Sequence, residues 1–569
     1  MITIKKNIAE KISERIAAVY GAEMTASDIE TMLEYPPDSK MGDLALPCFK
    51  LSRTLRNAPV KIAQSIAEGF EVESVERADA VNGYFNIYLS ADYMANAVLT
   101  KVNEKGERYG APNMGEGRTV VLDYSSPNVA KPFHIGHLGT TVIGHSLKCL
   151  HEFAGYKCVG INYLGDWGTQ FGKLIVAYRL WGNRELIEEG GIDKLVELYV
   201  KFHEEAEKDA TLNDKARAEF RKLEDGDTDN IELWRWFVDI SLVEYKKTYK
   251  QLGIEFDSYK GESFYTDKMP AQVEKLRQMG IMKIDDGASI VDLEEYGMPP
   301  CLILKRDGST LYPTRDIAAA VYRKETYDFD KAIYVTAAGQ SLHFKQWFKV
   351  VELMGYDWFD KLVHVPYGTV SINGAKLATR TGNVILLKDL FALAIEKVAA
   401  IMEEKNPNLT NKDEIAEAVG VGAIVFYYLS GSRMKDINFV MEEALSFDGN
   451  TGPYVQYTYA RSCSVLEKGG KPDYTKKIKI TAPEEAELVK TISLFEEKVI
   501  EAIESYEPSV IIRYILDVAA AFNRFYHNCS ILGVDDEDVK NTRLMLADAV
   551  KRTLGNAFGL VCIKKTEKI

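Results

Sequence analysis

The clearest prediction of the fold comes from residues 119–150, TVVLDYSSPNVAKPFHIGHLGTTVIGHSLKCL. It begins with Thr119–Tyr124, a short apolar run typical of a buried parallel strand. After a loop, leucine and valine recur at helical spacing from His137 to Leu150. Strand, loop and helix in this order form the repeating unit of a doubly wound sheet. The loop therefore lies at the carboxyl end of a strand, where such sheets bind ligands.

The loop gathers groups that suit a phosphate. It holds His134, His137 and Lys131, in a chain with only 8 histidines. Unpaired N–H groups at the start of the next helix favour an anion, and Gly136 allows a ligand to approach the backbone closely. An isolated H-x-x-H is otherwise a packed or solvated pair, and a zinc pair lacks a neighbouring glutamate or cysteine here. The strand, glycine and helix around the two histidines favour a phosphate-binding site instead. There, two imidazoles and an ammonium would stabilise the negative charge that develops on a phosphate in a transition state.

Composition limits the class of protein. With 569 residues, 46% hydrophobic and 27% charged, the chain is predicted to be soluble, with three or four domains. We find no membrane span and no signal peptide. Seven scattered cysteines without a C-x-x-C pair predict reduced thiols, a cytoplasmic location and no structural zinc. A net charge of -14 means that any RNA partner is held by local basic patches and stacking surfaces.

Three segments of different character predict an α/β multidomain protein. Residues 1–113 form an α/β module, and the polar, glycine-rich EKGERYGAPNMGEG is typical of a linker at its boundary with the next domain. Residues 114–390 form the doubly wound domain, with further strands in CLILK, KAIYVT and LVHVPYGTVSI and a charged helical insertion at about 184–251. Residues 391–569 are almost wholly helical.

Several motifs resemble a known family. The His-Ile-Gly-His of residues 134–137 matches the first signature of class I aminoacyl-tRNA synthetases, and DYSSPNVAKPFHIGHL closely resembles arginyl-tRNA synthetases. GDWGTQFG, FDSYKGES, LYPTRD and FDGNTGPYVQYTYAR agree, in the family's order, over nearly the whole chain. The resemblance implies an N-terminal tRNA-binding domain, a Rossmann-like catalytic domain with a helical insertion, and an all-α anticodon-binding domain.

The resemblance also implies a two-step arginine–tRNA ligase. L-arginine would attack the α-phosphorus of ATP to give arginyl-adenylate and pyrophosphate, and the arginyl group would pass to the 3′ end of tRNA(Arg). Such chemistry depends on positioning and on stabilising phosphate charge. We expect Mg²⁺ to accompany ATP, held mainly by phosphates and water. We further expect a cytoplasmic monomer that does not contact a membrane.

By the same resemblance, one set of residues acts in catalysis and ATP binding: His134, Gly136, His137, Lys131, Lys376 and Arg380. Lys376 and Arg380 lie in KLATR, which stands where the family has its second signature. Alone, this stretch is equally typical of a solvated turn. It departs from the family, because Thr379 replaces the second lysine and Ala378 the serine. We predict that Lys131 supplies the missing charge.

Six further residues are implied to bind arginine: Asp123, Asn128, Glu262, Tyr312, Asp316 and Gln340. Glu262, Tyr312 and Asp316 would hold the side chain, since only planar acceptors match the donor fork of a guanidinium. The other three would hold the ammonium and carboxylate. Taken singly, such acids are more often surface charges or helix caps, as Asp316 could be.

A tyrosine-rich stretch in the helical half is implied to contact tRNA through Tyr454, Gln456, Tyr457 and Arg461. Aromatic rings and arginine can stack on splayed bases. The alternative is packing within the helical bundle, because Tyr457 and Arg461 are one helical turn apart.

Two other classes of function remain open. A small-metabolite nucleotidyltransferase would use similar adenylate chemistry, but such enzymes usually lack a long helical C-terminal half. A retired synthetase acting in RNA binding or regulation would not need an intact His134, His137 and Lys131. No editing module is evident.

Overall fold

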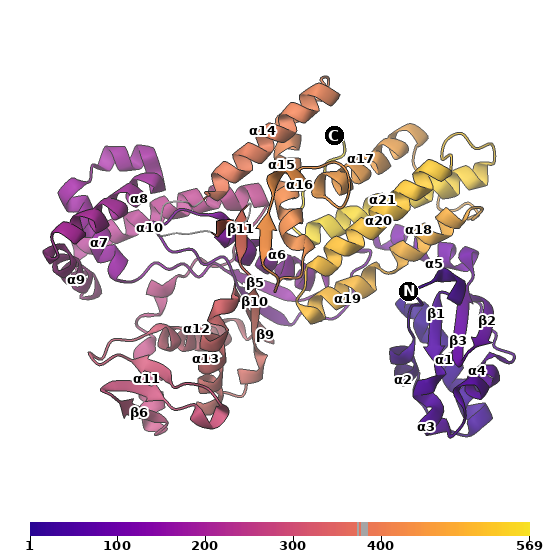
Figure 1. The fold of residues 1–569 in the computed structure, drawn as a ribbon, viewed down its shortest axis with the longest axis horizontal. Coiled ribbons are helices and arrows are strands. Elements are labelled where there is room, and N and C mark those ends of the chain that lie inside the picture. Colours follow the sequence, from indigo (N-terminus) through magenta and orange to yellow (C-terminus); the bar gives the residue numbers. More distant parts are fainter. Residues whose placement is uncertain (373–374, 377–384) are drawn as a thin grey trace.

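The parallel sheet at the centre of the molecule (Figure 1) has four strands in the order β10-β9-β4-β5. The computed structural model describes residues 1–372, 375–376 and 385–569, with only the backbone at Ser39, Ala375 and Lys376. The four strands are β4 (Thr119–Asp123), β5 (Lys157–Ile161), β9 (Lys331–Ala337) and β10 (Leu362–Tyr367). Asp123, at the end of β4, pairs with Ile161 on one side and Tyr334 on the other.

Helices cover both faces of this sheet. Val120 and Leu122 pack in the core that contains α6 (Leu138–Phe153), whereas Val121 packs in a separate core with α12 (Tyr312–Tyr327) and α13 (Ser341–Leu353). This alternation follows from the two-residue period of a strand. Chain order reverses between β4 and β9, which creates a crevice at their carboxyl ends.

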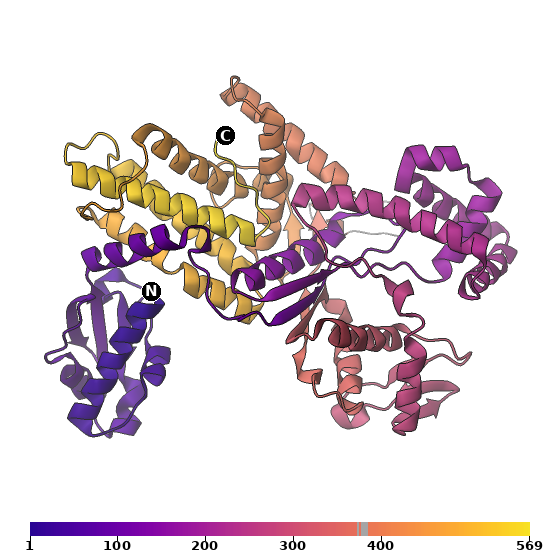
Figure 2. The same ribbon diagram turned by 180° about the vertical axis from the view of Figure 1, so that it is seen from behind.

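Two lobes extend together from one side of the sheet, on the left in Figure 1 and on the right in Figure 2. The first consists of α7 (Thr169–Trp181), α8 (Arg184–Lys208), α9 (Thr211–Glu224) and α10 (Thr228–Leu252). The second contains α11 (Met269–Gln278) and an antiparallel sheet of β6 (Met282–Asp285), β7 (Ala288–Val291) and β8 (Cys301–Leu304). 

One predicted strand of the parallel sheet lies elsewhere, and another belongs to it only in part. The CLILK strand, β8, pairs antiparallel with β7, so its assignment to the doubly wound sheet was wrong. LVHVPYGTVSI divides at Gly368 into β10 and β11 (Val370–Ile372), and β11 joins β12 (Ala375–Lys376) and β13 (Ile437–Phe439) in a small separate sheet. Short apolar strands look alike in sequence, whatever their partners.

The N-terminal domain is a three-stranded antiparallel sheet with helices. Its elements are α1 (Ile2–Tyr20), α2 (Ala26–Met32), β1 (Leu44–Pro47), α3 (Ser52–Leu55), α4 (Pro59–Ala67), β2 (Val75–Val81), β3 (Tyr84–Leu89) and α5 (Ala91–Lys105). The strand predicted at Tyr84–Leu89 is β3, the central strand. The domain is tied to the C-terminal helices by Lys490–Asp43 at 2.8 Å and Lys101–Glu496 at 2.7 Å.

The C-terminal half is helical. Its helices are α14 (Leu387–Lys405), α15 (Lys412–Ser430), α16 (Met441–Ala444), α17 (Gly452–Gly469), α18 (Pro483–Ser493), α19 (Phe495–Ser505), α20 (Ser509–Asn528) and α21 (Glu537–Leu560). The end of α21 lies against α6, where the Ser146 hydroxyl donates to the Leu560 carbonyl at 2.6 Å. This contact joins the helical half directly to α6, the helix that follows the loop of His134 and His137.

Candidate active site

The loop after β4 is held in place by α10 of the first lobe. The Tyr245 hydroxyl lies within hydrogen-bond distance of two carbonyls, those of Asn128 at 2.8 Å and Lys131 at 2.7 Å, between which its single hydrogen is shared. The Ala130 N–H donates to the Ser241 hydroxyl at 3.1 Å. Ala130 has a positive φ of 57°, a conformation that costs a non-glycine residue energy and is stabilised by these bonds. The lobe therefore fixes the backbone that presents Lys131 and the histidines.

The hydrogen bonds of the two histidines fix their tautomers. The Gly136 N–H donates to His134 Nδ1 at 3.1 Å, and the His134 N–H donates to His137 Nδ1 at 3.2 Å. Burial lowers the pKa of both rings, to about 3 for His137, and the nearby Lys131 lowers that of His134 further. Each ring is therefore neutral near pH 7, with its proton on Nε2, because Nδ1 accepts a backbone proton. Two Nε2–H donors result.

The segment that follows KLATR pairs with this loop. Leu386 forms an antiparallel bridge with His134, and the Leu387 N–H donates to the Phe133 carbonyl at 2.9 Å. The Lys376 side chain and Arg380, with Thr379 and Ala378, lie outside the described residues. Lys131 itself is exposed.

An acidic cluster lies beside the carboxyl end of β5. Glu262 begins the short helix Glu262–Tyr265 and is ion-paired with Arg315 of α12 at 2.7 Å. Burial raises the pKa of Glu262 to about 7; Asp316 and Asp166 raise it too, and Arg315 opposes them. Asp166 accepts from the backbone N–H and hydroxyl of Ser263 at 2.8 and 2.6 Å. These contacts bring two predicted arginine ligands, Glu262 and Asp316, into one charged cluster.

Asp316 has a partner that the sequence did not indicate. His343 Nε2 lies 2.6 Å from its Oδ2, and 21% of the Asp316 side chain is exposed. The alternative, that Asp316 caps the helix, is wrong, since the N-cap of α12 is Leu311 and the Asp316 side chain bonds to α13. With three carboxylates and one arginine, the cluster has an excess of negative charge that one guanidinium would reduce.

Asp123 is paired deep in the sheet. Its Oδ2 lies 2.7 Å from Arg323 Nη1, and only 1% of the Arg323 side chain and 8% of the Asp123 side chain are exposed. Three tyrosine rings surround the guanidinium: Tyr163, Tyr265 and Tyr334. Arg323 satisfies one oxygen of Asp123, and Ser126 donates to the other at 3.2 Å. Asp123 consequently shapes the crevice as part of a buried ion pair.

The other three predicted arginine ligands are exposed at the same crevice. Asn128 follows β4, Gln340 follows β9, and Tyr312 begins α12 with 66% of its surface exposed. The Arg315 guanidinium lies 5.8 Å from the centre of the Tyr312 ring. These side chains are accessible to a ligand in the crevice.

The four residues predicted to contact tRNA lie on α17 and separate into two groups. Gln456 is fully buried, and its amide donates to the Ala418 and Lys564 carbonyls at 3.2 and 3.1 Å. The prediction that Gln456 contacts tRNA is therefore corrected, because the Gln456 side chain packs between helices. Tyr454 accepts a hydrogen bond from Asn523 at 2.9 Å. Tyr457 is 44% exposed, and the Arg461 guanidinium lies 5.0 Å from its ring.

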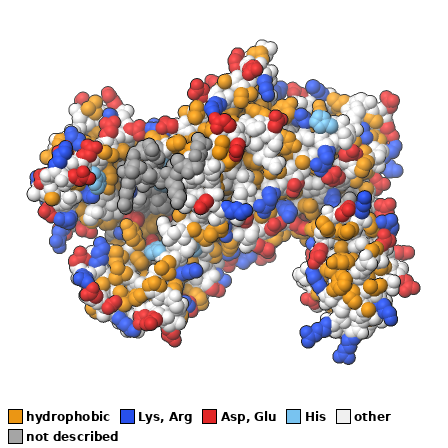
Figure 3. Space-filling model, viewed as in Figure 1, with side chains coloured by type: hydrophobic (Ala, Val, Ile, Leu, Met, Phe, Trp, Pro, Cys, Tyr) orange, Lys and Arg blue, Asp and Glu red, His pale blue; other side chains and the backbone are white. Residues whose placement is uncertain are grey.

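Tyr526 of α20, which the sequence analysis did not single out, lies, like Tyr457, next to Arg461. Its ring lies 4.9 Å from the Arg461 guanidinium and is 39% exposed. Acidic and basic side chains are interspersed over the face shown in Figure 3. A partner with an anionic backbone would therefore be held by such local surfaces.

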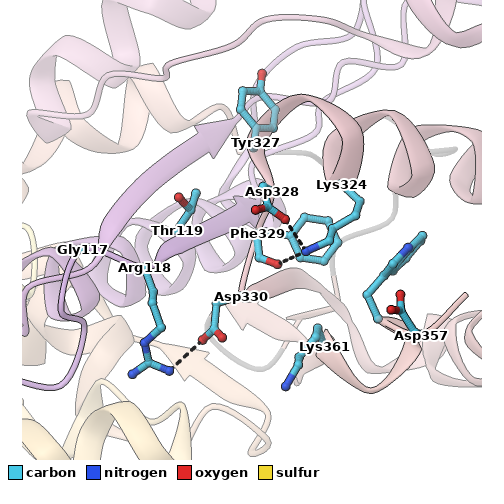
Figure 4. Close-up of a pocket in the computed structure, with 11 residues that line it drawn as sticks. Gly117, Arg118, Thr119, Lys324, Tyr327, Asp328, Phe329, Asp330, Asp357 and Lys361 are labelled. Atoms are coloured by element: carbon cyan, nitrogen blue, oxygen red, sulfur yellow. Dashed lines mark hydrogen bonds and ion pairs between the residues drawn. The ribbon is translucent and has the colours of Figure 1, made fainter.

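A separate cavity of about 700 Å³ lies at the opposite edge of the sheet, where β4 and β9 begin (Figure 4). Arg118 is paired there with Asp330 at 3.3 Å, and Lys324 with Asp328 at 2.7 Å. Because its basic groups already have partners and it lies away from the histidines, we assign it no part in the site.

Neither a metal-binding cluster nor a membrane-spanning helix is found in the described part of the chain. Within residues 1–372, 375–376 and 385–569, no group of three His, Cys, Asp or Glu side chains is arranged to hold a metal ion. In the same part of the chain, no helix is long and apolar enough to cross a membrane.

Three family models match successive parts of the chain. Residues 3–89 match the arginyl tRNA synthetase N terminal domain, residues 98–441 the catalytic domain of class I (R) tRNA synthetases, and residues 455–569 the DALR anticodon binding domain. The catalytic match extends beyond residue 390, where we placed the boundary. The doubly wound sheet, the histidine loop and these matches define a class I tRNA synthetase, and the predicted fold class is confirmed.

Curated relatives and solved structures narrow the class. Arginine–tRNA ligase of Alkaliphilus metalliredigens is 48% identical over 572 residues, and that of Clostridium perfringens 48% over 571, with 99–100% of each chain covered. Arginyl-tRNA synthetase of Thermus thermophilus has a TM-score of 0.83 at 26% identity, covering 99% of this chain and 100% of the other. That of Plasmodium falciparum has a TM-score of 0.82 at 24% identity, covering 100% and 99%. The chain belongs to the arginyl-tRNA synthetase family.

Proposed function

We propose that the crevice at the ends of β4 and β9 is where this chain performs the reaction of its family, the ATP-dependent ligation of L-arginine to tRNA. The observation that carries this assignment is the half-buried cluster of Glu262, Asp316 and Asp166. Carboxylates in a restricted space favour a planar cation with several donors, which is what the arginine side chain offers. Exposed Tyr312 would lie against the guanidinium, while Asn128 and Gln340 would hold the ammonium and carboxylate.

The phosphates of ATP would lie against the histidine loop. Two neutral imidazoles with Nε2–H donors can bond to phosphate oxygens without the cost of burying extra positive charge. Gly136 opens the backbone to the nucleotide, and Lys131 adds the cation that Thr379 does not. Lys376 and Arg380 would act on the pyrophosphate; in the sequence they precede Leu386, which pairs with His134.

Mg²⁺ would enter with the nucleotide and neutralise phosphate charge. The donors of the histidine loop are imidazoles and an ammonium, which do not suit Mg²⁺, so phosphates and water would hold the ion. This chain's own residues would bind and orient the α-phosphate while arginine attacks it.

Two surfaces would bind tRNA. Tyr457, Arg461 and Tyr526 offer exposed rings and a cation for stacking on anticodon bases. The N-terminal domain, held to α18 and α19, would contact a second part of the same tRNA. We further propose a monomer that acts in the cytoplasm.

The test is ATP–pyrophosphate exchange with each of the amino acids in turn, with and without total tRNA. Exchange confined to arginine and strengthened by tRNA is the expected result. Exchange with another amino acid would contradict the assignment of the acidic cluster. Exchange with none would favour a retired synthetase, and tRNA-independent use of a small metabolite would favour a nucleotidyltransferase.

A further inference from the structure

Arg315 lies where the proposed substrate guanidinium is to be recognised. Its Nη1 is 2.7 Å from Glu262 Oε2, and 12% of the Arg315 and 16% of the Glu262 side chain are exposed. Its guanidinium also faces the Tyr312 ring at 5.8 Å. The chain's own arginine thus contacts two of the three residues proposed to bind the arginine side chain.

Without such a cation, the carboxylates of the acidic cluster would repel one another. The charged groups that face Glu262 come from two other elements: Arg315 and Asp316 of α12, and Asp166 of the loop after β5. The Tyr163 hydroxyl, on that same loop, is a further titratable neighbour of Glu262, and burial raises its pKa, so it stays neutral. Asp316 in turn is bonded to His343 of α13. Like charges in a half-buried space favour protonation of one carboxylate. A protonated glutamic acid would lose most of its attraction for a guanidinium.

We infer that Arg315 is a positioning residue that favours the ionised form of Glu262 and orients its carboxylate before the substrate binds, and this inference rests on the proposed role of Glu262. A carboxylate offers about four acceptor positions, so a single contact with Arg315 leaves others for the substrate. Arg315 remains in place during binding, because removing a half-buried arginine from its partner would leave both charges uncompensated.

The consequence is a characteristic pH dependence. Since burial places the pKa of Glu262 at about 7, kcat/KM for arginine in the wild-type enzyme rises as the pH increases through about 7. Removing the Arg315 charge moves this rise upward, because an opposite charge nearby is lost. For a shift of about one to two pH units, kcat/KM for arginine at pH 7 falls about 5- to 50-fold. The loss shrinks to less than about fivefold at pH 8.5.

The experiment measures kcat/KM for arginine by ATP–pyrophosphate exchange with saturating tRNA, from about pH 6 to 8.5. The proteins compared are wild type, Arg315→Gln, Arg315→Lys and Glu262→Gln. Arg315→Gln is expected to show the raised inflection, and Arg315→Lys to restore the wild-type inflection because the charge remains. KM for ATP is expected to be unchanged.

The matched control is Arg543→Gln. Arg543 pairs with buried Glu485 at 2.6 Å, with 11% of its side chain exposed, but lies among the C-terminal helices. Its loss is expected to lower stability and leave the pH profile for arginine unchanged. A profile altered as in Arg315→Gln would show that the effect is only structural.

The remaining outcomes separate the inference from the proposed function. If Glu262→Gln loses arginine use while Arg315→Gln keeps the wild-type inflection, the inference is overturned and the site assignment stands. If Glu262→Gln uses arginine normally, both fail. A loss in Arg315→Gln that is equal at every pH, without rescue by lysine, also overturns the inference. Should the glutamine variant not fold, an upward shift in Arg315→Lys would contradict it.

Discussion

Replacing Asp316 by alanine tests the proposed recognition of arginine most sharply at a single residue. The residue is the second carboxylate of the acidic cluster, with His343 at 2.6 Å and about a fifth of the side chain, 21%, exposed. Removing one partner of a buried charge pair costs about 3–5 kcal/mol. Because Asp316 is not fully buried, we expect the lower end, about 3 kcal/mol, or roughly a 150-fold loss of kcat/KM for arginine.

The assay is ATP–pyrophosphate exchange with tRNA present, varying arginine at fixed ATP and then ATP at fixed arginine. KM for ATP is expected to stay near its wild-type value, since the histidine loop is a separate element. Asp316→Asn retains a hydrogen-bonding oxygen near His343 but loses the charge, so its loss is expected to be smaller than that of alanine. An Asp316→Ala enzyme with near-normal kcat/KM for arginine would remove Asp316 from the site.

Three further predictions concern the phosphate loop and tRNA. Lys131→Ala is expected to slow adenylate formation about 100- to 1,000-fold. Adding Thr379→Lys to that variant is expected to recover part of the loss, whereas Thr379→Lys alone gains little. Strictly additive effects on the single-turnover rate would show that Lys131 does not supply the charge missing at Thr379. Deleting residues 1–89 leaves α5 packed on α18. The deletion is expected to weaken tRNA binding while arginine-dependent ATP–pyrophosphate exchange persists. Unchanged aminoacylation of limiting tRNA would show that the N-terminal domain has another role. Exposed Tyr457→Ala is expected to lower tRNA affinity without loss of stability, whereas Tyr459→Ala, only 4% exposed, lowers the melting temperature; equal melting losses would indicate that Tyr457 is a packing residue.

The central part of the fold was predictable because its signal is local. An apolar run, a glycine-containing loop and a helical repeat follow one another within residues 119–150, and the structure has β4, the histidine loop and α6 there. The location of CLILK was not predictable in the same way. Its residues favour a strand, but β8 pairs antiparallel with β7, and pairing partners are a property of the whole chain.

The ligand-side residues of the candidate site were suggested by motifs, but their partners were not. Arg315, Arg323 and His343 each form an ion pair or hydrogen bond with a predicted acid that lies 53, 200 and 27 residues away, respectively. Sequence spacing does not report contacts over such separations. One signal was present. Ser241, Tyr245 and Tyr249 recur every four residues on α10, a polar stripe in a charged helix, and all three bond to the loop or its base.

The most direct test of the central claim is to identify the amino acid that this protein attaches to tRNA. The purified chain is incubated with ATP, Mg²⁺, total tRNA and an equimolar mixture of the amino acids. The tRNA is then digested, and the terminal aminoacyl-adenosine is identified by mass spectrometry. The account predicts arginyl-adenosine alone, lost in Glu262→Gln and in Asp316→Ala at limiting arginine. A different aminoacyl-adenosine, or uncharged tRNA throughout, would contradict it.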